Sequence, residues 1–265
     1  MLIESIANLA PYVESAGQMA LADQRQQNYF ARDYKSDGSA VTKTDRRVED
    51  YLFEHVSKLY PTVNILTEET ARSFDPAKPY TFAIDPIDGT DVFSQGMHGW
   101  CVSIGLLDER LKPIAGLLFS PRLDLFFVAD VGKSAALNGT PIQLPSSPEP
   151  LSERSNLMVS SGIQKRVDLT KLPGKMRNLG SSALHLSFPL IYPGVFGAIE
   201  TPRAHIWDIA GAHAINLSVG FDLEFIDGRT LDYARMTDGS MAGETILSGT
   251  KESIRELRSK LTRIS

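Results

Sequence analysis

The heptapeptide Ile84-Asp85-Pro86-Ile87-Asp88-Gly89-Thr90 constrains the fold of this chain more than any other stretch. A short β-type run precedes it, and Pro86 fixes φ and lacks an amide donor, so a regular strand is interrupted there. Gly89 lets the chain turn sharply and lets a bare amide approach a ligand closely. We expect a strand end that directs Asp85 and Asp88 to one point. Hard divalent cations prefer such oxygen atoms, although Asp, Pro and Gly are also ordinary turn residues.

Length and composition are those of an ordinary globular protein. The chain has 265 residues, of which 42% are hydrophobic, and a formal net charge of −5. The negative charge argues against non-specific binding to a nucleic-acid polymer. No apolar run approaches the ~18 residues of a membrane span, and no secretory leader pattern is visible. A single cysteine excludes an intrachain disulfide and favours a cytoplasmic location.

Acidic residues also lie at the ends of two other predicted elements in the first half. Thr44 is a candidate N-cap for a helix, which places Asp45 in its first turn; a carboxylate there can serve the helix dipole or a site. The strand expected over residues 62–66 runs into Glu68 and Glu69, which can equally be solvated surface charges. Consecutive strands are often neighbours, so these acidic groups can meet those of the heptapeptide.

A proline-rich segment, Pro145–Pro150, divides the chain and is typical of an exposed connection between domains. Before it, helical periodicity over the first thirty residues and after Asp45 precedes a β meander between residues 100 and 128. After it, strands and helices alternate. We therefore expect an N-terminal α+β half, residues 1–145, and a C-terminal α/β half, residues 151–265.

Two stretches of the second half are chemically suggestive. Gly180-Ser181-Ser182-Ala183 precedes a predicted helix, where amides can bind an anion or a hydroxyl-rich ligand, or where a serine simply caps the helix. Trp207-Asp208-Ile209-Ala210-Gly211 places Asp208 in the first turn of another helix, whose small residues permit close approach of an element or ligand. An aspartate at that position alone is most often a dipole partner.

Three motifs in this order resemble those of the inositol monophosphatase superfamily of Mg²⁺-dependent, lithium-sensitive phosphatases: Glu68-Glu69, Asp85–Thr90 and Trp207–Gly211. The resemblance covers essentially the whole chain. It implies a five-layered α/β/α/β/α sandwich of the sugar-phosphatase type, and a homodimer. It also implies a small phosphorylated substrate.

The resemblance assigns roles residue by residue. It implies two or three Mg²⁺ ions, or Mn²⁺ in their place, held by Glu68, Asp85, the carbonyl of Ile87, Asp88 and Asp208. Asp45, Glu68 and Thr90 would be catalytic, Asp45 and Thr90 by orienting and deprotonating the attacking water. Asp88, Gly89, Thr90, Ser181 and Ser182 would contact the substrate. The chemistry is consistent, because paired cations neutralise phosphate and generate hydroxide. Without them the facing carboxylates repel one another.

Several functions stay open at this stage. We expect hydrolysis of an inositol monophosphate or another small polyol or sugar phosphate. A 3′(2′),5′-bisphosphate nucleotidase is the alternative, suggested by the Lys35–Thr42 loop; fructose-1,6-bisphosphatase and histidinol-phosphatase activities are further options. Glu200 lies eight residues before Asp208, where the family's substrate-contacting glutamate lies seven before, so its role is not assigned. A non-catalytic metal- or ligand-binding regulatory protein is disfavoured, because the complete carboxylate set would have no purpose in it.

Overall fold

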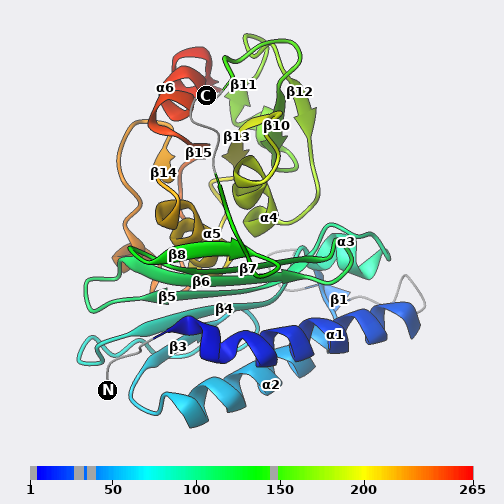
Figure 1. Cartoon of the computed structure of the whole chain (residues 1–265), viewed down its shortest axis with the longest axis vertical. Helices are drawn as coiled ribbons and strands as arrows, with labels where there is room; N and C mark the ends of the chain where they lie inside the picture. The colour runs from blue at the N-terminus through cyan, green and yellow to red at the C-terminus, as the bar shows by residue number, and fades with distance from the viewer. Residues whose placement is uncertain (1–4, 27–32, 35–39, 144–148, 265) are drawn as a thin grey trace.

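Two sheets and the helices around them are stacked along the long axis of the molecule (Figure 1). The structure, a computed structural model, describes residues 5–26, 33–34, 40–143 and 149–264. Both ends of the helical stretch expected over the first thirty residues, most of the Lys35–Thr42 loop and most of the proline-rich connection lie outside the described residues.

The first sheet contains seven strands in the order β3-β4-β5-β6-β7-β8-β9. β3 runs parallel to β4, and every other neighbouring pair is antiparallel. The strands are β3 (Asn64–Thr67), β4 (Thr81–Asp88), β5 (Cys101–Leu107), β6 (Pro113–Ser120), β7 (Leu125–Asp130), β8 (Ser134–Leu137) and β9 (Thr140–Pro141). The meander expected between residues 100 and 128 is therefore confirmed.

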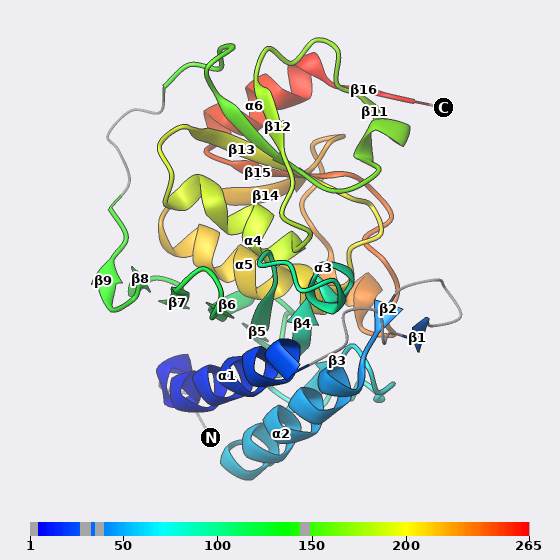
Figure 2. The ribbon, with the colours of Figure 1, turned by 90° about the vertical axis from the view of Figure 1, so that its right-hand side faces the viewer.

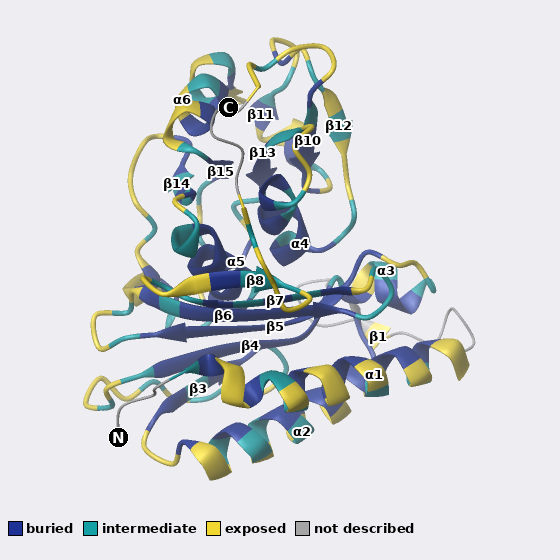
Figure 3. Ribbon diagram, viewed as in Figure 1, coloured by how far each residue is buried: buried dark blue, intermediate teal, exposed yellow. Residues whose placement is uncertain are grey.

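Helices α1 (Ala10–Gln26) and α2 (Lys43–Leu59) cover one face of this sheet (Figures 1 and 2). A short 3₁₀ helix, Ile6–Leu9, leads into α1, so Pro11 falls in the first turn of α1, where a missing amide donor is tolerated. The buried sides of both helices face the sheet and their exposed sides face solvent (Figure 3). Their apolar stripes share one hydrophobic cluster with strands β4, β5 and β6.

The second sheet contains five strands in the order β12-β10-β13-β15-β14. β10 is parallel to β12 and to β13, whereas β15 is antiparallel to β13 and to β14. The strands are β10 (Asn156–Val159), β12 (Lys175–Arg177), β13 (Val195–Glu200), β14 (Asp222–Phe225) and β15 (Ile246–Gly249). The chain passes from one sheet to the other between Pro141 and Asn156.

Helices α4 (Ser182–Ser187) and α5 (Ile206–Ser218) lie between the two sheets, and α6 (Lys251–Lys260) lies beyond the second (Figure 2). One hydrophobic cluster joins the inner helices to both sheets, and a separate one joins α6 to the second sheet. The mixed α/β class expected from the sequence is confirmed.

The remaining elements are short. They are β1 (Asp33–Tyr34) paired with β2 (Ala40–Val41), β11 (Val167–Asp168) paired with β16 (Thr262–Arg263), helix α3 (Thr90–Ser94), and the 3₁₀ turns Ile163–Lys165, Phe188–Leu190 and Tyr233–Met236. Within the described part of the chain, none of the helices has the length and apolarity to cross a bilayer.

Helix α5 contacts the first sheet almost backbone to backbone. A Cβ atom added to Gly116 on β6 would lie 2.2 Å from the carbonyl oxygen of Gly211 on α5. A Cβ atom added to Gly105 on β5 would lie 2.6 Å from the amide nitrogen of Gly211. Real side chains do not fit such gaps, so these glycines are required for the close approach. This contact fixes the position of the helix whose first turn carries Asp208.

Candidate active site

The heptapeptide forms the last part of β4 and the turn after it. β4 extends through Asp88, and its pairing with β5 changes register between Asp85 and Asp88, at Pro86. β3 ends beside β4, with Thr67 opposite Ile84 in a parallel ladder. The predicted neighbouring of the two strands is thus confirmed, and Glu68 leaves β3 next to Asp85.

Asp45 is held at the start of α2 by a capping box. The N-cap is Thr42, not Thr44 as the sequence suggested, because Thr42 has the extended backbone of a cap and Thr44 is already helical. Asp45 Oδ2 accepts the backbone amide of Thr42 at 2.8 Å, and its Oδ1 accepts the hydroxyl of Thr90 at 2.9 Å. Asp45 is fully buried, and the structure brings it to Thr90 as the resemblance implied.

The hydroxyl of Thr90 lies 2.9 Å from both Asp45 Oδ1 and the carbonyl oxygen of Ile87. A hydroxyl carries one proton and two lone pairs, so it can donate to only one of these acceptors at a time. When it donates to Ile87, a protonated Asp45 can donate to it in turn. Burial, followed by the negative charge of Glu68, raises the pKa of Asp45 to about 6, which makes both arrangements accessible.

Gly89 makes the turn between β4 and helix α3. Its φ of 96° lies in the left-handed region, and an added Cβ would lie 3.1 Å from the carbonyl oxygen of Gly99. Both observations explain why glycine follows Asp88. Thr90 is the first residue of α3. The backbone amides of Gly89 and Thr90 therefore lie in the turn and at the start of this helix.

The N-terminus of α4 binds the Asp88 carboxylate. The hydroxyl of Ser181 donates to Asp88 Oδ2, the amide of Ala183 donates to the same atom at 2.7 Å, and the amide of Ser182 donates to Oδ1 at 3.2 Å. Ser181 is fully buried and also caps α4 by accepting the amide of Leu184 at 3.1 Å. Its observed contact is therefore with Asp88, while Ser182 is the more accessible serine.

Asp208 occupies the first turn of α5, as expected. Its Oδ2 accepts the backbone amide of His205 at 2.8 Å, the reciprocal bond of a capping box. The ring of His205 stacks on that of Trp207 with centroids 5.0 Å apart, and His205 Nδ1 lies 2.9 Å from the carbonyl oxygen of Gly239. Asp208 thus lies in the first turn of a helix whose N-cap, His205, is held by Trp207 and by Gly239.

The four acidic side chains at the centre interact electrostatically. Burial first, and then the charges of Glu68, Asp88 and Asp208, raise the pKa of Asp85 well above its usual value. Burial, Asp88 and Glu68 do the same to the pKa of Asp208. Burial raises the pKa of Asp88 to about 6, against hydrogen bonds that lower it. Glu68, Asp85, Asp88 and Asp208 therefore form one acidic cluster, to which we refer as the carboxylate cluster.

In their present rotamers the three aspartates of the carboxylate cluster accept hydrogen bonds from backbone amides. Asp85 Oδ1 accepts the amide of Ile87 at 2.9 Å, and Asp88 and Asp208 accept the amides described above. Among the residues that the structure describes, no three His, Cys, Asp or Glu side chains are arranged to enclose a metal ion directly. The donor chemistry nevertheless suits a hard cation, because every group is an oxygen and the charges repel one another.

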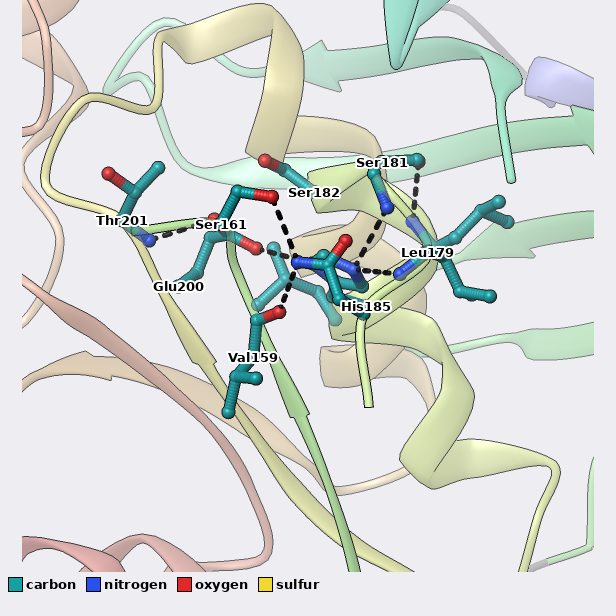
Figure 4. A network of polar contacts seen from close by, with 12 residues as sticks. Val159, Ser161, Leu179, Ser181, Ser182, His185, Glu200 and Thr201 are labelled. Atoms are coloured by element: carbon teal, nitrogen blue, oxygen red, sulfur yellow. Dashed lines mark hydrogen bonds and ion pairs between the residues drawn. The ribbon is translucent and has the colours of Figure 1, made fainter. Parts of the chain in front are cut away.

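Glu200, whose role the sequence left unassigned, lies at the end of β13 and is fully buried. Its Oε2 lies 2.9 Å from Nδ1 of His185, and its Oε1 accepts the amide of Thr201 at 2.8 Å (Figure 4). His185, the partner of Glu200, was not predicted from the sequence as a functional residue. Its position on the short helix after the Gly-Ser-Ser stretch was the one available signal.

The raised pKa of Asp45 predicts a pH dependence of stability in the absence of metal. A carboxyl group whose pKa rises on folding from 3.8 to about 6 stabilises the fold below pH 3.8, and this contribution is lost as the pH rises through about 6. The difference in unfolding free energy between wild type and Asp45→Asn should therefore fall between about pH 4.5 and 6.5. Urea unfolding in chelator measures it, and parallel curves would contradict the burial of an ionisable Asp45.

Comparisons with known proteins agree with this architecture. The profile of the inositol monophosphatase family matches residues 5–262. Inositol monophosphatase 3 of Solanum lycopersicum is 32% identical over 198 residues, which are 68% of this chain and 71% of the relative. The 3′(2′),5′-bisphosphate nucleotidase CysQ of Buchnera aphidicola is 26% identical over 242 residues, 88% of each chain.

A solved structure with the same fold is that of SaIMPase-II, from Staphylococcus aureus, with bound inositol monophosphate. It superposes with a TM-score of 0.71 at 25% identity, over 95% of this chain and 92% of that one. The same protein with bound 2′AMP gives a TM-score of 0.73. The fold and these relatives are those of phosphatases. The chain belongs to the inositol monophosphatase family.

Proposed function

We propose that this protein hydrolyses a small phosphomonoester, with Mg²⁺ bound at the carboxylate cluster. The observation that carries the proposal is the convergence of four acidic side chains from the end of β3, from β4 and from α5, where neighbouring carboxylates raise the pKa of Asp85 and of Asp208. Such a cluster is costly in a protein unless a cation or a proton compensates it. In a phosphatase of this family the cluster has a purpose, because the cations that it would bind also neutralise the anionic substrate.

The site residues would have two kinds of role: some would bind metal, and others would move a proton or contact the substrate. Glu68, Asp85, Asp88, Asp208 and the carbonyl of Ile87 would hold two or three Mg²⁺ ions, or Mn²⁺ in their place, after the carboxylates turn from the amides they now accept. Bound Mg²⁺ supplies charge neutralisation for the phosphate and a water of lowered pKa.

Thr90 and Asp45 would remove the proton from the attacking water. The hydroxyl of Thr90 lies between Asp45 Oδ1 and the Ile87 carbonyl, so a proton can pass through it to Asp45 Oδ1. A pKa of about 6 leaves Asp45 mostly ionised at pH 7 and therefore able to accept that proton. The turn amides of Gly89 and Thr90 and the accessible start of α4 at Ser182 would contact the substrate. Ser181 would act through its bond to Asp88.

Two substrate classes have support from relatives. The tomato relative is named an inositol monophosphatase, and SaIMPase-II has been solved with inositol monophosphate, which favours a polyol or sugar phosphate. The Buchnera relative, which spans 88% of this chain, is named a bisphosphate nucleotidase, and SaIMPase-II has also been solved with 2′AMP. Hydrolysis of an inositol-type monophosphate is our first proposal and that of a nucleoside bisphosphate the second. Inhibition by Li⁺, a homodimer and a cytoplasmic location are implied by the resemblance and stay predictions.

A phosphate-release assay tests the proposal. Purified protein should hydrolyse inositol monophosphates, sugar phosphates or adenosine bisphosphates only when Mg²⁺ or Mn²⁺ is present, because the carboxylate cluster otherwise repels the anionic substrate. Excess chelator should abolish turnover, and Mg²⁺ added in excess over the chelator should restore it. Turnover that continues unchanged in chelator would refute the metal-dependent function, and the ratio of kcat/KM values across the panel ranks the two substrate classes.

A further inference from the structure

The buried pair formed by His185 and Glu200 (Figure 4) has no part in the proposed chemistry, yet a chain of contacts connects it to Asp88. Both side chains are almost completely buried, with 2% and 0% of their surface exposed. Buried polar groups of this kind need partners, and both have them. Oε1 of Glu200 accepts the amide of Thr201, and Oε2 faces Nδ1 of His185 at 2.9 Å.

The contacts of His185 fix its tautomer. The backbone amide of Leu179 donates to Nε2 at 2.9 Å, and the amide of Gly180 points to the same atom at 3.4 Å. A ring nitrogen that accepts an amide proton carries none of its own, so the ring proton is on Nδ1 and is donated to Glu200. Glu200 therefore orients the ring, and the ring holds two consecutive amides of the turn before α4.

The same turn is confined on its other side by glycine contacts. A Cβ added to Gly99 would lie 2.1 Å from the carbonyl oxygen of Leu179. Gly180 has a φ of +102°, and a Cβ added there would lie 2.4 Å from Cγ1 of Val92. The turn is thus fitted between the start of β5 and α3 on one side and His185 on the other.

The residues that follow this turn are those that bind Asp88. The Ser181 hydroxyl and the amides of Ser182 and Ala183 all donate to its carboxylate. Any displacement of Leu179 and Gly180 moves these three donors. Hydrogen bonds and the backbone of this turn thus connect His185 and Glu200 to Asp88.

We propose that His185 and Glu200 are positioning residues for Asp88, acting through the turn of residues 179–181. The inference rests on the proposed function, in which Asp88 binds metal. Residues that orient metal-binding groups through hydrogen bonds commonly change metal affinity or activity 10–100-fold when replaced.

The experiment compares His185→Phe, which removes both contacts of the ring, with His185→Gln, which keeps an acceptor for the turn amides and a donor for Glu200. The matched control is His213→Phe. His213 is the other buried histidine with a carboxylate partner, since its Nε2 lies 3.0 Å from Asp222 Oδ1 and its Nδ1 lies 2.9 Å from the Tyr233 hydroxyl. None of these contacts reaches the carboxylate cluster.

Three readouts are measured on each protein: the Mg²⁺ concentration at half-maximal rise in melting temperature, kcat against KM, and amide hydrogen exchange of residues 179–183 without metal. For His185→Phe we expect the Mg²⁺ midpoint to rise about tenfold and kcat to fall about tenfold, with KM within about twofold. Exchange at residues 179–183 should become faster. His185→Gln should recover most of each effect, and His213→Phe should lower only the melting temperature.

The outcomes separate this inference from the proposed function. Wild-type protein that releases no phosphate refutes the function, while the exchange and melting measurements still test the positioning. Unchanged exchange at residues 179–183 together with an unchanged Mg²⁺ midpoint in His185→Phe overturns the inference whatever the substrate. Equal effects in His213→Phe overturn it as well, because the loss would then be one of general stability. If His185→Phe does not fold, Glu200→Gln takes its place. Thr201 and His185 donate to different oxygens of Glu200, and in glutamine one of these two acceptors becomes an NH₂ group.

Discussion

Asp85→Asn should reduce phosphate release by about 1,000-fold or more, because Asp85 is the member of the carboxylate cluster on which all three others act. The same substitution should leave the metal-free protein as stable as the wild type or more stable. Burial and repulsion raise the pKa of Asp85, so keeping this group in the fold at neutral pH costs free energy. Asparagine removes that cost and retains the oxygen that accepts the Ile87 amide.

The two effects are measured as single-turnover phosphate release and as melting temperature in chelator. Asp130→Asn is a suitable control, since Asp130 also lies in the first sheet and accepts hydrogen bonds from Ser5 and Ile6 far from the site. Loss of activity accompanied by loss of stability would instead assign Asp85 a structural role. Near-normal turnover would remove Asp85 from the catalytic site.

Asp208→Asn should lower kcat by about 100-fold or more while the protein stays folded. Asn retains an oxygen for the His205 amide, 2.8 Å away, so the start of α5 is preserved. Removing the charge takes away the contribution of the second half of the chain to the carboxylate cluster. The Mg²⁺ midpoint should rise at the same time, which a titration of the melting temperature measures.

Asp232→Asn provides the comparison for Asp208. Asp232 also accepts a backbone amide at the start of a short helix, that of Ala234 at 3.2 Å, but it is exposed and takes no part in the cluster. Its replacement should leave kcat unchanged. If both variants retain full turnover, the helix-cap interpretation of Asp208 is sufficient and its place in the site is wrong.

The elements with strong patterns were predictable from the sequence. β13 was expected over residues 195–200 and is observed there, because a short apolar run that contains β-branched and aromatic residues and lies between turn residues favours a strand over a helix. β12, with the sequence Lys-Met-Arg, gives only the weak signal of a short β-like run before Gly180, since it is an edge strand whose side chains are mostly accessible. The N-cap of α2 was misplaced by two residues because Thr42 and Thr44 are chemically equivalent, and backbone conformation alone distinguishes them.

The parts of the candidate site that lie within one short motif were predictable from the sequence. The contacts between residues far apart in the sequence were not. Asp85 and Asp88 are recognisable from proline, glycine and carboxylates within one turn. The hydrogen bond from Ser181 to Asp88 joins residues that are 93 positions apart in the sequence, so no local sequence pattern predicts it. The pairing of His185 with Glu200 depends on how α4 lies against the end of β13, so it follows from packing between layers.

The interlocked glycines at the junction of α5 with β5 and β6 have a consequence for how the enzyme works. Carbonyl and amide groups that meet there without intervening side chains oppose sliding of α5 along the first sheet. We therefore expect substrate entry and product departure to depend on small local rearrangements at the rim of the site. We expect the rate of turnover to depend on how quickly the segments at this rim move, while the two sheets keep their relative position.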